Sequence, residues 1–164
     1  MKTAIYPGSF DPITLGHLNI IKRAAVCFDK LVVCVLVNSE KDGALFAPDE
    51  RVELIQRVVG RLPNVEVDRS SGLLSDYCRR RKACVVVKGL RAVSDYEKEV
   101  QMALINRKLN PRLETMFLPS SAKYTYLSSS VVKEMAFYGA DLSDFVPREI
   151  IDDVNEKMKN RRDG

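Results

Sequence analysis

Two apolar runs in this 164-residue chain, LVVCVLV at 31–37 and CVVVK at 84–88, do not alternate with polar residues. Continuous β-branched runs are typical of strands buried on both faces, as in a parallel sheet covered by helices. Three shorter runs, TAIYP at 3–7, VEV at 65–67 and TMFL at 115–118, are further candidate strands. The sequence therefore predicts a parallel sheet of five strands.

Helical patterns separate these strands. The second pattern begins with Pro48 and two acidic residues, which is typical of a helix start. The third begins with Ser94 and has Glu97 three residues later, as a capping box does, and the fourth ends at Gly139, a candidate C′ residue. The patterns lie at residues 15–28, 48–62, 94–109, 129–139 and 147–160.

The alternation of strands and helices favours an α/β fold, a doubly wound, Rossmann-like parallel five-stranded sheet with helices on both faces. No internal repeat, low-complexity stretch or linker divides the chain. We therefore expect a single domain over residues 1–164, with the C-terminal helices (about 141–160) packed on it.

Composition excludes several classes of protein. Hydrophobic residues make up 46% and charged residues 29%, as in an ordinary globular protein, and no apolar run approaches the roughly 20 residues that cross a bilayer. The net charge of +4 is compatible with anionic substrates but too small and dispersed to predict nucleic-acid binding, and we interpret CRRRKAC at 78–84 as a solvated face. Without a signal peptide, we expect a cytoplasmic protein with no membrane and no nucleic-acid partner.

The four cysteines form no CxxC pair. A zinc site is disfavoured with one distant histidine, and a chain of this length needs no disulfide framework. We expect reduced, mostly buried thiols, with Cys34 and Cys84 inside strands.

The stretch YPGSFDPITLGH at 6–17 follows the first strand and ends at the one histidine of the chain. In doubly wound sheets, ligands bind where loops leave the carboxyl ends of the strands. Gly8 permits close backbone approach, and Thr14 and His17 share one face if a helix begins near residue 14, with Gly16 leaving that face open. The free amides of such a helix start form an anion site.

GSFDP followed by TLGH resembles the signature of the nucleotidyltransferases related to class I aminoacyl-tRNA synthetases. The stretches DERVELIQ, VVKGLRAVSDYEKEVQMALINRKLNP, ETMFLPSS and YLSSSVVKEMAFYG extend the resemblance in order along nearly the whole chain. The chain is thereby identified as a member of the phosphopantetheine adenylyltransferase family.

This resemblance implies transfer of AMP from ATP to 4′-phosphopantetheine, giving dephospho-coenzyme A and pyrophosphate. The acceptor phosphate would attack the α-phosphate in line, without a covalent enzyme intermediate. The family also implies Mg²⁺ bound mainly through ATP phosphates and water, with no protein metal ligand, a homohexamer, and feedback inhibition by coenzyme A.

By the same resemblance, His17 stabilises the transition state, Lys41 bridges the reacting phosphates and Arg91 points at phosphate. The residues that the resemblance assigns to ATP are Ser9, Phe10, His17, Gly89, Leu90, Arg91, Glu99, Tyr124, Thr125, Tyr126, Leu127, Ser128, Ser129 and Ser130. Those that it assigns to the acceptor are Ser9, Lys41, Leu73, Leu74 and Lys88.

Two positions depart from the commoner family pattern: Ser9 replaces threonine and keeps the hydroxyl, and Lys88 replaces arginine and loses its bidentate fork.

Residue types alone leave structural alternatives open. Lys41 also fits a solvated loop lysine, and Glu99 a surface acid paired with Lys98 or Lys108. Leu73 and Leu74 also fit core anchors of a short helix beginning near Ser75, Ser9 fits a turn hydroxyl, and KGLR a basic turn.

The protonation state of His17 also stays open, because a helix N-terminus disfavours the imidazolium whereas bound phosphates favour it. Two other functions are alternatives. A sister enzyme, such as a nicotinamide mononucleotide adenylyltransferase or a cytidylyltransferase, would share the first loop but not the block from KGLR to NRKLNP. A nucleotide-sensing or RNA-binding module would have lost catalysis, which the intact histidine and Lys41 disfavour.

Overall fold

The computed structural model describes residues 1–37 and 43–163, apart from the side chains of residues 93 and 94. Its sheet has the strand order β3-β2-β1-β4-β5, and every neighbouring pair is parallel. The predicted parallel five-stranded sheet is confirmed. The strands are β1 (Thr3–Gly8), β2 (Lys30–Val37), β3 (Val65–Ser71), β4 (Val85–Leu90) and β5 (Glu114–Pro119).

Both faces of the central strands are buried, which explains the uninterrupted apolar runs. Along β2, Leu31, Val33 and Val35 join one hydrophobic cluster, whereas Val32 and Cys34 join a second cluster on the opposite face. All five side chains are fully buried.

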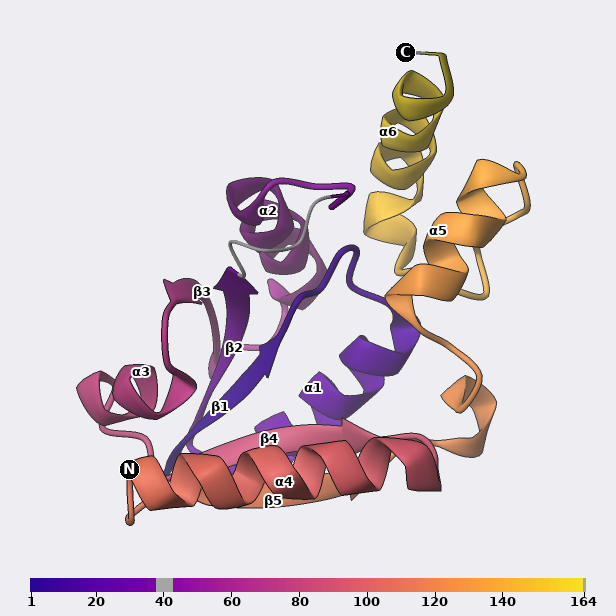
Figure 1. The fold of residues 1–164 in the computed structure, drawn as a ribbon. Coiled ribbons are helices and arrows are strands. Elements are labelled where there is room, and N and C mark those ends of the chain that lie inside the picture. The colour runs from indigo at the N-terminus through magenta and orange to yellow at the C-terminus, as the bar shows by residue number, and fades with distance from the viewer. Residues whose placement is uncertain (38–42, 164) are drawn as a thin grey trace.

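Helices cover the two faces (Figure 1). The first cluster takes its helical residues from α1, α2, α5 and α6, the second takes them from α3, and α4 packs on β4, β5 and α3. The predicted doubly wound arrangement is therefore confirmed. The helices are α1 (Leu15–Cys27), α2 (Pro48–Val59), α3 (Leu74–Arg80), α4 (Val93–Leu109), α5 (Ser129–Phe137) and α6 (Ile151–Asp163), with 3₁₀ turns η1 (Ala122–Tyr124) and η2 (Arg148–Ile150).

The C-terminal part of the chain shares the first cluster rather than forming one of its own. Its buried members are Leu142, Val146, Ile150, Val154 and Met158. Figure 1 shows α5 and α6 side by side at the carboxyl end of β1. Among the described residues, no helix combines the length and the apolar character that a membrane span requires.

Three details differ from expectation. Cys84 precedes β4 and is exposed, as is Cys27, so two thiols rather than most are buried. Burial raises the pKa of Cys34 to about 11 and that of Cys78 to about 12.

The other two differences concern helix starts. The predicted cap at Ser94 is wrong, because α4 begins at Val93 and its N-cap is Ala92. Asp95 fixes this turn instead, since its carboxylate accepts the backbone N–H of Arg91 at 3.3 Å. The predicted helix from Pro147 begins as the 3₁₀ turn η2 and becomes α-helical only at Ile151.

Candidate active site

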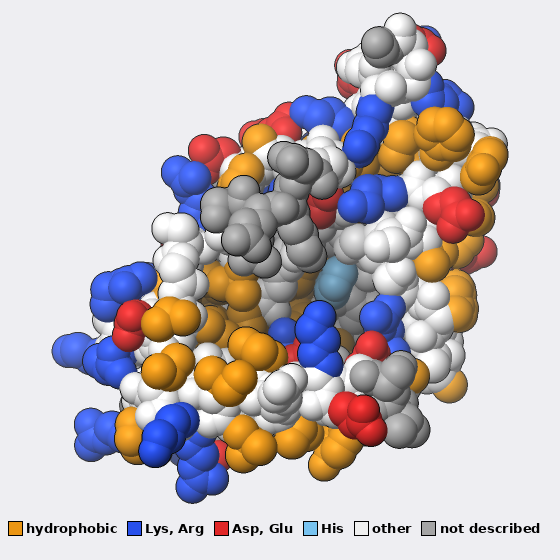
Figure 2. Space-filling model, viewed as in Figure 1, with side chains coloured by type: hydrophobic (Ala, Val, Ile, Leu, Met, Phe, Trp, Pro, Cys, Tyr) orange, Lys and Arg blue, Asp and Glu red, His pale blue; other side chains and the backbone are white. Residues whose placement is uncertain are grey.

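A cleft of about 970 Å³ opens at the carboxyl ends of β1 and β4. The chain runs from β1 to one side of the sheet through β2 and β3, and to the other side through β4 and β5, so this is its topological switch point. Figure 2 shows this hollow with the one histidine at its floor and lysine and arginine side chains around it. Such a cleft suits a polyanionic ligand.

The start of α1 fixes the orientation of His17. Thr14 is the N-cap, and its hydroxyl accepts the backbone N–H of His17 at 3.2 Å. In return, the Nδ1 atom of His17 accepts the backbone N–H of Thr14 at 3.0 Å. A backbone N–H can only donate, so Nδ1 carries no proton and the neutral ring carries its proton on Nε2.

The surroundings of His17 keep the ring neutral. Burial in the cleft, together with the positive charges of Arg91 and Lys88, lowers the pKa of His17 to about 4. The Phe10 ring packs against the imidazole in an edge-to-face contact with centroids 5.0 Å apart. A Cβ atom at Gly8 would come within 3.0 Å of the Phe10 ring, so the close approach that this glycine permits is made by Phe10. The imidazole is thus a neutral, pre-oriented Nε2–H donor.

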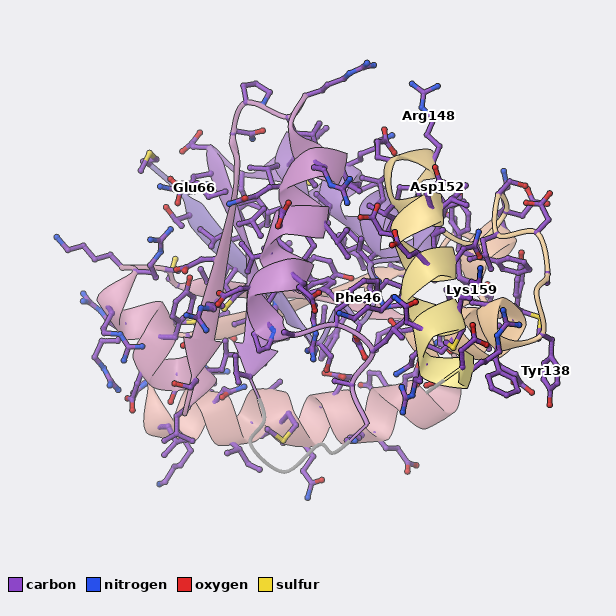
Figure 3. All side chains as sticks on the ribbon, turned by 90° about the horizontal axis from the view of Figure 1, so that it is seen from above. Phe46, Glu66, Tyr138, Arg148, Asp152 and Lys159 are labelled. Atoms are coloured by element: carbon purple, nitrogen blue, oxygen red, sulfur yellow. The ribbon has the colours of Figure 1, made fainter. Side chains whose placement is uncertain are left out.

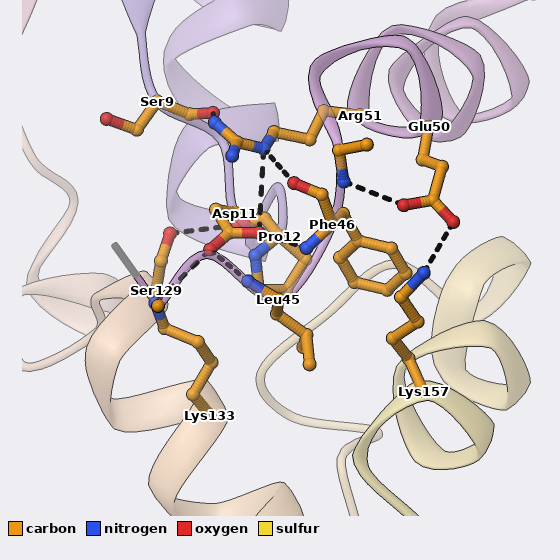
Figure 4. A network of polar contacts seen from close by, with 12 residues as sticks. Ser9, Asp11, Pro12, Leu45, Phe46, Glu50, Arg51, Ser129, Lys133 and Lys157 are labelled. Carbon is orange, nitrogen blue, oxygen red and sulfur yellow. Dashed lines mark hydrogen bonds and ion pairs between the residues drawn. The ribbon is translucent and has the colours of Figure 1, made fainter. Parts of the chain in front are cut away.

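Asp11 joins three segments beneath the cleft (Figure 4). Its buried carboxylate accepts the backbone N–H groups of Leu45 at 2.9 Å and Phe46 at 2.8 Å. Lys133 of α5 lies 3.3 Å from the same carboxylate, and the Nε atom of Arg51 lies 3.6 Å from it. The first loop, the chain before α2, and α5 are therefore held by one carboxylate.

The backbone of the first loop accepts two further hydrogen bonds, at the carbonyls of Ser9 and Pro12. Arg51 donates from Nε to the carbonyl of Phe46 at 2.7 Å and from a terminal nitrogen to the carbonyl of Ser9 at 3.1 Å. The hydroxyl of Ser129 donates to the carbonyl of Pro12 at 2.8 Å. The loop that presents His17 is therefore braced from both α2 and α5.

Two cationic side chains at the end of β4, Lys88 in the strand and Arg91 just after it, are paired with carboxylates. The Nζ atom of Lys88 in β4 lies 3.3 Å from a carboxylate oxygen of Glu99 in α4. Glu99 is therefore paired with Lys88 and not with Lys98 or Lys108. Arg91 lies 3.3 Å from Asp95 and donates to the carbonyl of Leu127 at 2.9 Å. The four side chains are 25–40% exposed, so a bound phosphate can compete for the two cations.

The start of α5 repeats part of the arrangement at α1. Ser128 is the N-cap and accepts the backbone N–H of Val131 at 3.2 Å. The hydroxyl of Ser129 is used in the bond to Pro12, and Ser130 lines the cleft. Two of the three hydroxyls thus have internal partners, and the anion-binding capacity of this junction lies mainly in its first backbone amides.

Most of the residues predicted for the site lie together. The predicted residues that line the cleft are Ser9, Phe10, His17, Lys88, Gly89, Arg91, Glu99, Tyr124, Leu127, Ser128, Ser129 and Ser130. Leu90, Thr125 and Tyr126 are not in this lining, and neither are Leu73, the exposed N-cap of α3, and Leu74, which packs on the second cluster. Lys41 lies outside the described residues.

Sequence reasoning gave no role to Asp11, Arg51, Asp95 or Lys133, which also line the cleft. Asp11 and Arg51 stand within the quoted stretches GSFDP and DERVELIQ, so a signal was present. Lys133 lies one helical turn after Ser129, a spacing that places both side chains on one face of α5. Among the described residues, no group of three or more His, Cys, Asp or Glu side chains is arranged to hold a metal ion.

Comparison with known proteins identifies the family. The Cytidylyltransferase-like family profile matches residues 5–135. A curated phosphopantetheine adenylyltransferase of Clostridium botulinum is 56% identical over 163 residues, covering 99% of each chain. The chain belongs to the phosphopantetheine adenylyltransferase family. The curated phosphopantetheine adenylyltransferase of Clostridium tetani is 55% identical over 161 residues, covering 98% of this chain and all of the relative.

Solved structures that resemble this phosphopantetheine adenylyltransferase family member share its fold at low identity. A putative nicotinate-nucleotide adenylyltransferase from Vibrio parahaemolyticus has a TM-score of 0.68 at 21% identity, covering 98% of this chain and 93% of that one. A bifunctional NMN adenylyltransferase/ADP ribose pyrophosphatase from Francisella tularensis has a TM-score of 0.69 at 13% identity, covering 99% and 49%. At such identities, the likeness supports the Rossmann-like fold alone.

Proposed function

We propose that this protein transfers AMP from ATP to the phosphate of 4′-phosphopantetheine, giving dephospho-coenzyme A and pyrophosphate in coenzyme A biosynthesis. The observation that carries the proposal is the neutral His17 imidazole, which Thr14 holds through Nδ1 so that Nε2 carries the proton, at the floor of a cationic cleft. The full-length identity of 56% to a curated phosphopantetheine adenylyltransferase supports the choice of acceptor.

The acceptor needs no nucleophilic side chain, because its phosphate oxygen is already anionic at neutral pH. That oxygen attacks the α-phosphorus of ATP and forms a new P–O bond. The bond between the α-phosphorus and the oxygen that bridges it to the β-phosphate breaks, and pyrophosphate leaves with that oxygen. The protein aligns the two oxygens and stabilises the charge that develops on the α-phosphate. The Nε2–H of His17 donates to an α-phosphate oxygen, and the Nδ1 contact with Thr14 keeps that donor oriented.

Two cations at the end of β4 would hold the phosphates. Lys88 would exchange Glu99 for the acceptor phosphate, and Arg91 would exchange Asp95 for a phosphate of ATP. Ser9 and the Phe10 backbone would contact the reacting region, and the amides that open α5 would hold the β- and γ-phosphates. The remaining assignments to ATP (Gly89, Leu90, Glu99 and 124–130) and to the acceptor (Lys41, Leu73 and Leu74) stay predictions.

The donor set of the cleft fits a magnesium ion that is bound through ATP. Its described carboxylates, Asp11, Asp95 and Glu99, each face a lysine or arginine. Magnesium commonly keeps several waters and takes oxygens from substrate phosphates. When bound, it would neutralise charge on the phosphates of ATP, so we propose no protein ligand for it.

We further propose that residues 1–164 form one domain that assembles as a homohexamer in the cytoplasm. The core cluster shared by both ends of the chain supports one domain, and the four free cysteines, two of them exposed, support a reducing compartment. Self-assembly is supported by apolar side chains that α4 and β5 leave exposed. These are Met102, Leu104, Ile105, Leu109 and Met116. Light scattering on the purified chain measures the assembly.

The test of function is AMP transfer with a panel of phosphate acceptors. The protein is incubated with ATP, Mg²⁺ and either phosphopantetheine, nicotinamide mononucleotide or nicotinate mononucleotide, and pyrophosphate release and the adenylated product are measured. We expect turnover with phosphopantetheine alone. Turnover with a mononucleotide would identify a sister adenylyltransferase, and ATP binding without any turnover would identify a nucleotide-sensing module.

A further inference from the structure

The chain from Gly43 to Ala47, here named the Gly43–Ala47 segment, forms part of the cleft on the β2 side of β1. Asp11 holds its inner side by accepting the amides of Leu45 and Phe46, and Arg51 holds the Phe46 carbonyl. The segment then enters α2 at Pro48. Its position therefore determines the shape of that side of the cleft.

The outer side of the same segment is held by the C-terminal helix α6. Lys157 lies 2.6 Å from one oxygen of Glu50, whose other oxygen accepts the backbone N–H of Ala47 at 2.7 Å. The ammonium group of Lys157 also lies 5.6 Å from the centroid of the Phe46 ring. Figure 3 shows Phe46 between α2 and α6, and Figure 4 shows Lys157 and Glu50 beside it.

A second contact from α6 reaches the beginning of the segment. Arg161 donates to the carbonyl of Gly43 at 3.1 Å. Gly43 has a φ of +98°, a conformation that other residues rarely adopt. Lys157 and Arg161 are four residues apart and lie on one face of α6.

Lys157 and Arg161 lie outside the lining of the cleft. No described residue of α6 lines the cleft, and α6 is fixed to the core through the buried side chains of Val154 and Met158. The hydrogen bond from Lys157, and to a lesser degree that from the Ala47 amide, holds the pKa of the Glu50 carboxyl below its usual range. Within the described part of the chain, Lys157 and Arg161 therefore reach the cleft through the Gly43–Ala47 segment.

We propose that Lys157 and Arg161 are positioning residues for the acceptor half of the reaction. The inference rests on the proposed function, in which the predicted acceptor residues Leu73 and Leu74 follow β3, on the same side of β1 as the Gly43–Ala47 segment, whereas Lys88 lies in β4. The residues predicted to bind ATP belong largely to the other side of β1, after β4 and before α5. A loosened Gly43–Ala47 segment should therefore weaken use of phosphopantetheine more than use of ATP.

The test combines Lys157→Ala with Arg161→Ala in the full-length protein. We expect the KM for phosphopantetheine to rise about threefold to tenfold, as loss of part-exposed contacts allows, with the KM for ATP changed less than about twofold. The matched control is Arg162→Ala, because Arg162 is the next residue and donates instead to the Phe137 carbonyl of α5. The control should leave both KM values unchanged.

Three results would overturn the inference: unchanged KM values in the double variant, an equal rise in both, or the same rise in the Arg162→Ala control. Rescue separates positioning from general damage, because Lys157→Arg with Arg161→Lys keeps both cations and should restore most of the KM for phosphopantetheine. Thermal unfolding checks that the variants stay folded.

A second readout does not depend on activity. Hydrogen exchange of the Leu45, Phe46 and Ala47 amides should be faster in the double variant than in the wild type and in Arg162→Ala. If the wild-type protein did not adenylate phosphopantetheine, the proposed function would fail while this readout still tested the hold of α6 on the segment. Unchanged exchange rates in the double variant would refute the hold itself.

Discussion

The two junctions at which a loop enters a helix beside the cleft, at Thr14 and at Ser128, begin alike and differ in one side chain. Each has a hydroxyl N-cap that accepts the amide of the residue three positions later. At α1 that residue is His17, whose Nδ1 atom in turn accepts the backbone N–H of the cap residue Thr14. At α5 it is Val131, whose side chain has no atom that can accept a hydrogen bond. The first junction thus orients a polar donor, and the second orients only backbone amides.

The junctions also differ in how they are supported. Asp11 and Thr14 at the first are buried, with exposed fractions of 5% and 1%. The second junction is attached to the first, because the Ser129 hydroxyl donates to the Pro12 carbonyl and Lys133 forms an ion pair with Asp11. The first junction is therefore the more completely buried of the two, and the second is held in place partly through it.

Removal of the imidazole should have the largest effect. We expect His17→Ala to lower kcat by about 10²–10³, the usual cost of a lost transition-state donor, with little change in ATP affinity. Steady-state kinetics and equilibrium ATP binding check this, with His17→Gln as a control that keeps an N–H donor and part of the rate. Equal losses in kcat and ATP affinity would contradict the role.

Removal of the shared carboxylate comes next. Asp11→Asn leaves Arg51 and Lys133 without their anion and places an amide N–H group against a backbone N–H, so we expect a loss of about 3 kcal/mol in the free energy of unfolding. Urea denaturation measures it. Asp29→Asn is the control, because Asp29 is exposed and, in the part of the chain that the structure describes, accepts only the Lys2 amide. It should change stability by less than about 0.5 kcal/mol.

The protonation of His17 gives a smaller, pH-dependent effect. Its folded pKa of about 4 lies below the ordinary 6.5, so the unfolded chain binds a proton that the folded chain refuses as pH falls from 7 towards 4. We expect this to cost about 1–2 kcal/mol of stability by pH 5 relative to a His17→Gln variant, whose stability lacks this contribution.

The one histidine of the chain also allows a direct measurement. An NMR titration of the imidazole should show no inflection near pH 6.5 and a proton on Nε2 at pH 7. A pKa near 6.5, or a proton on Nδ1, would contradict the account of the first junction.

Much of the fold and site could be predicted from the sequence because their signals are local. Burial on both faces of β2 removes all alternation from its sequence, and the spacing of Thr14 and His17 depends only on where α1 begins. The resemblance supplied twelve positions that line one cleft. These features need no knowledge of which distant residues meet.

The residues that were missed act through long-range contacts. Asp11 binds amides 34 and 35 residues away and a lysine 122 residues away, and no periodicity encodes such a partner. The protonation state of His17 is another case, because its pKa is lowered by burial and by the charges of Arg91 and Lys88, which lie more than 70 residues further along the chain. The cap predicted at Ser94 was wrong because α4 begins one residue earlier, at Val93. At this turn it is the carboxylate of Asp95 that accepts a backbone N–H, that of Arg91.

The last prediction separates the two junctions by matched removal of their caps. Thr14→Ala and Ser128→Ala each remove a hydroxyl that accepts one helix amide, so each should lower stability by about 1 kcal/mol. Only Thr14→Ala also removes a hydroxyl that lies 3.1 Å from Nδ1 of His17. We therefore expect kcat to fall severalfold in Thr14→Ala, with almost no change in kcat in Ser128→Ala.

Stability measurements make the two variants comparable, and kinetics then isolate the difference. Equal stability losses with unequal kcat would mean that the first cap serves the imidazole in addition to the helix. Equal kcat losses would mean that both caps act only by holding their helices, and the backbone N–H of Thr14 alone would then suffice to orient His17.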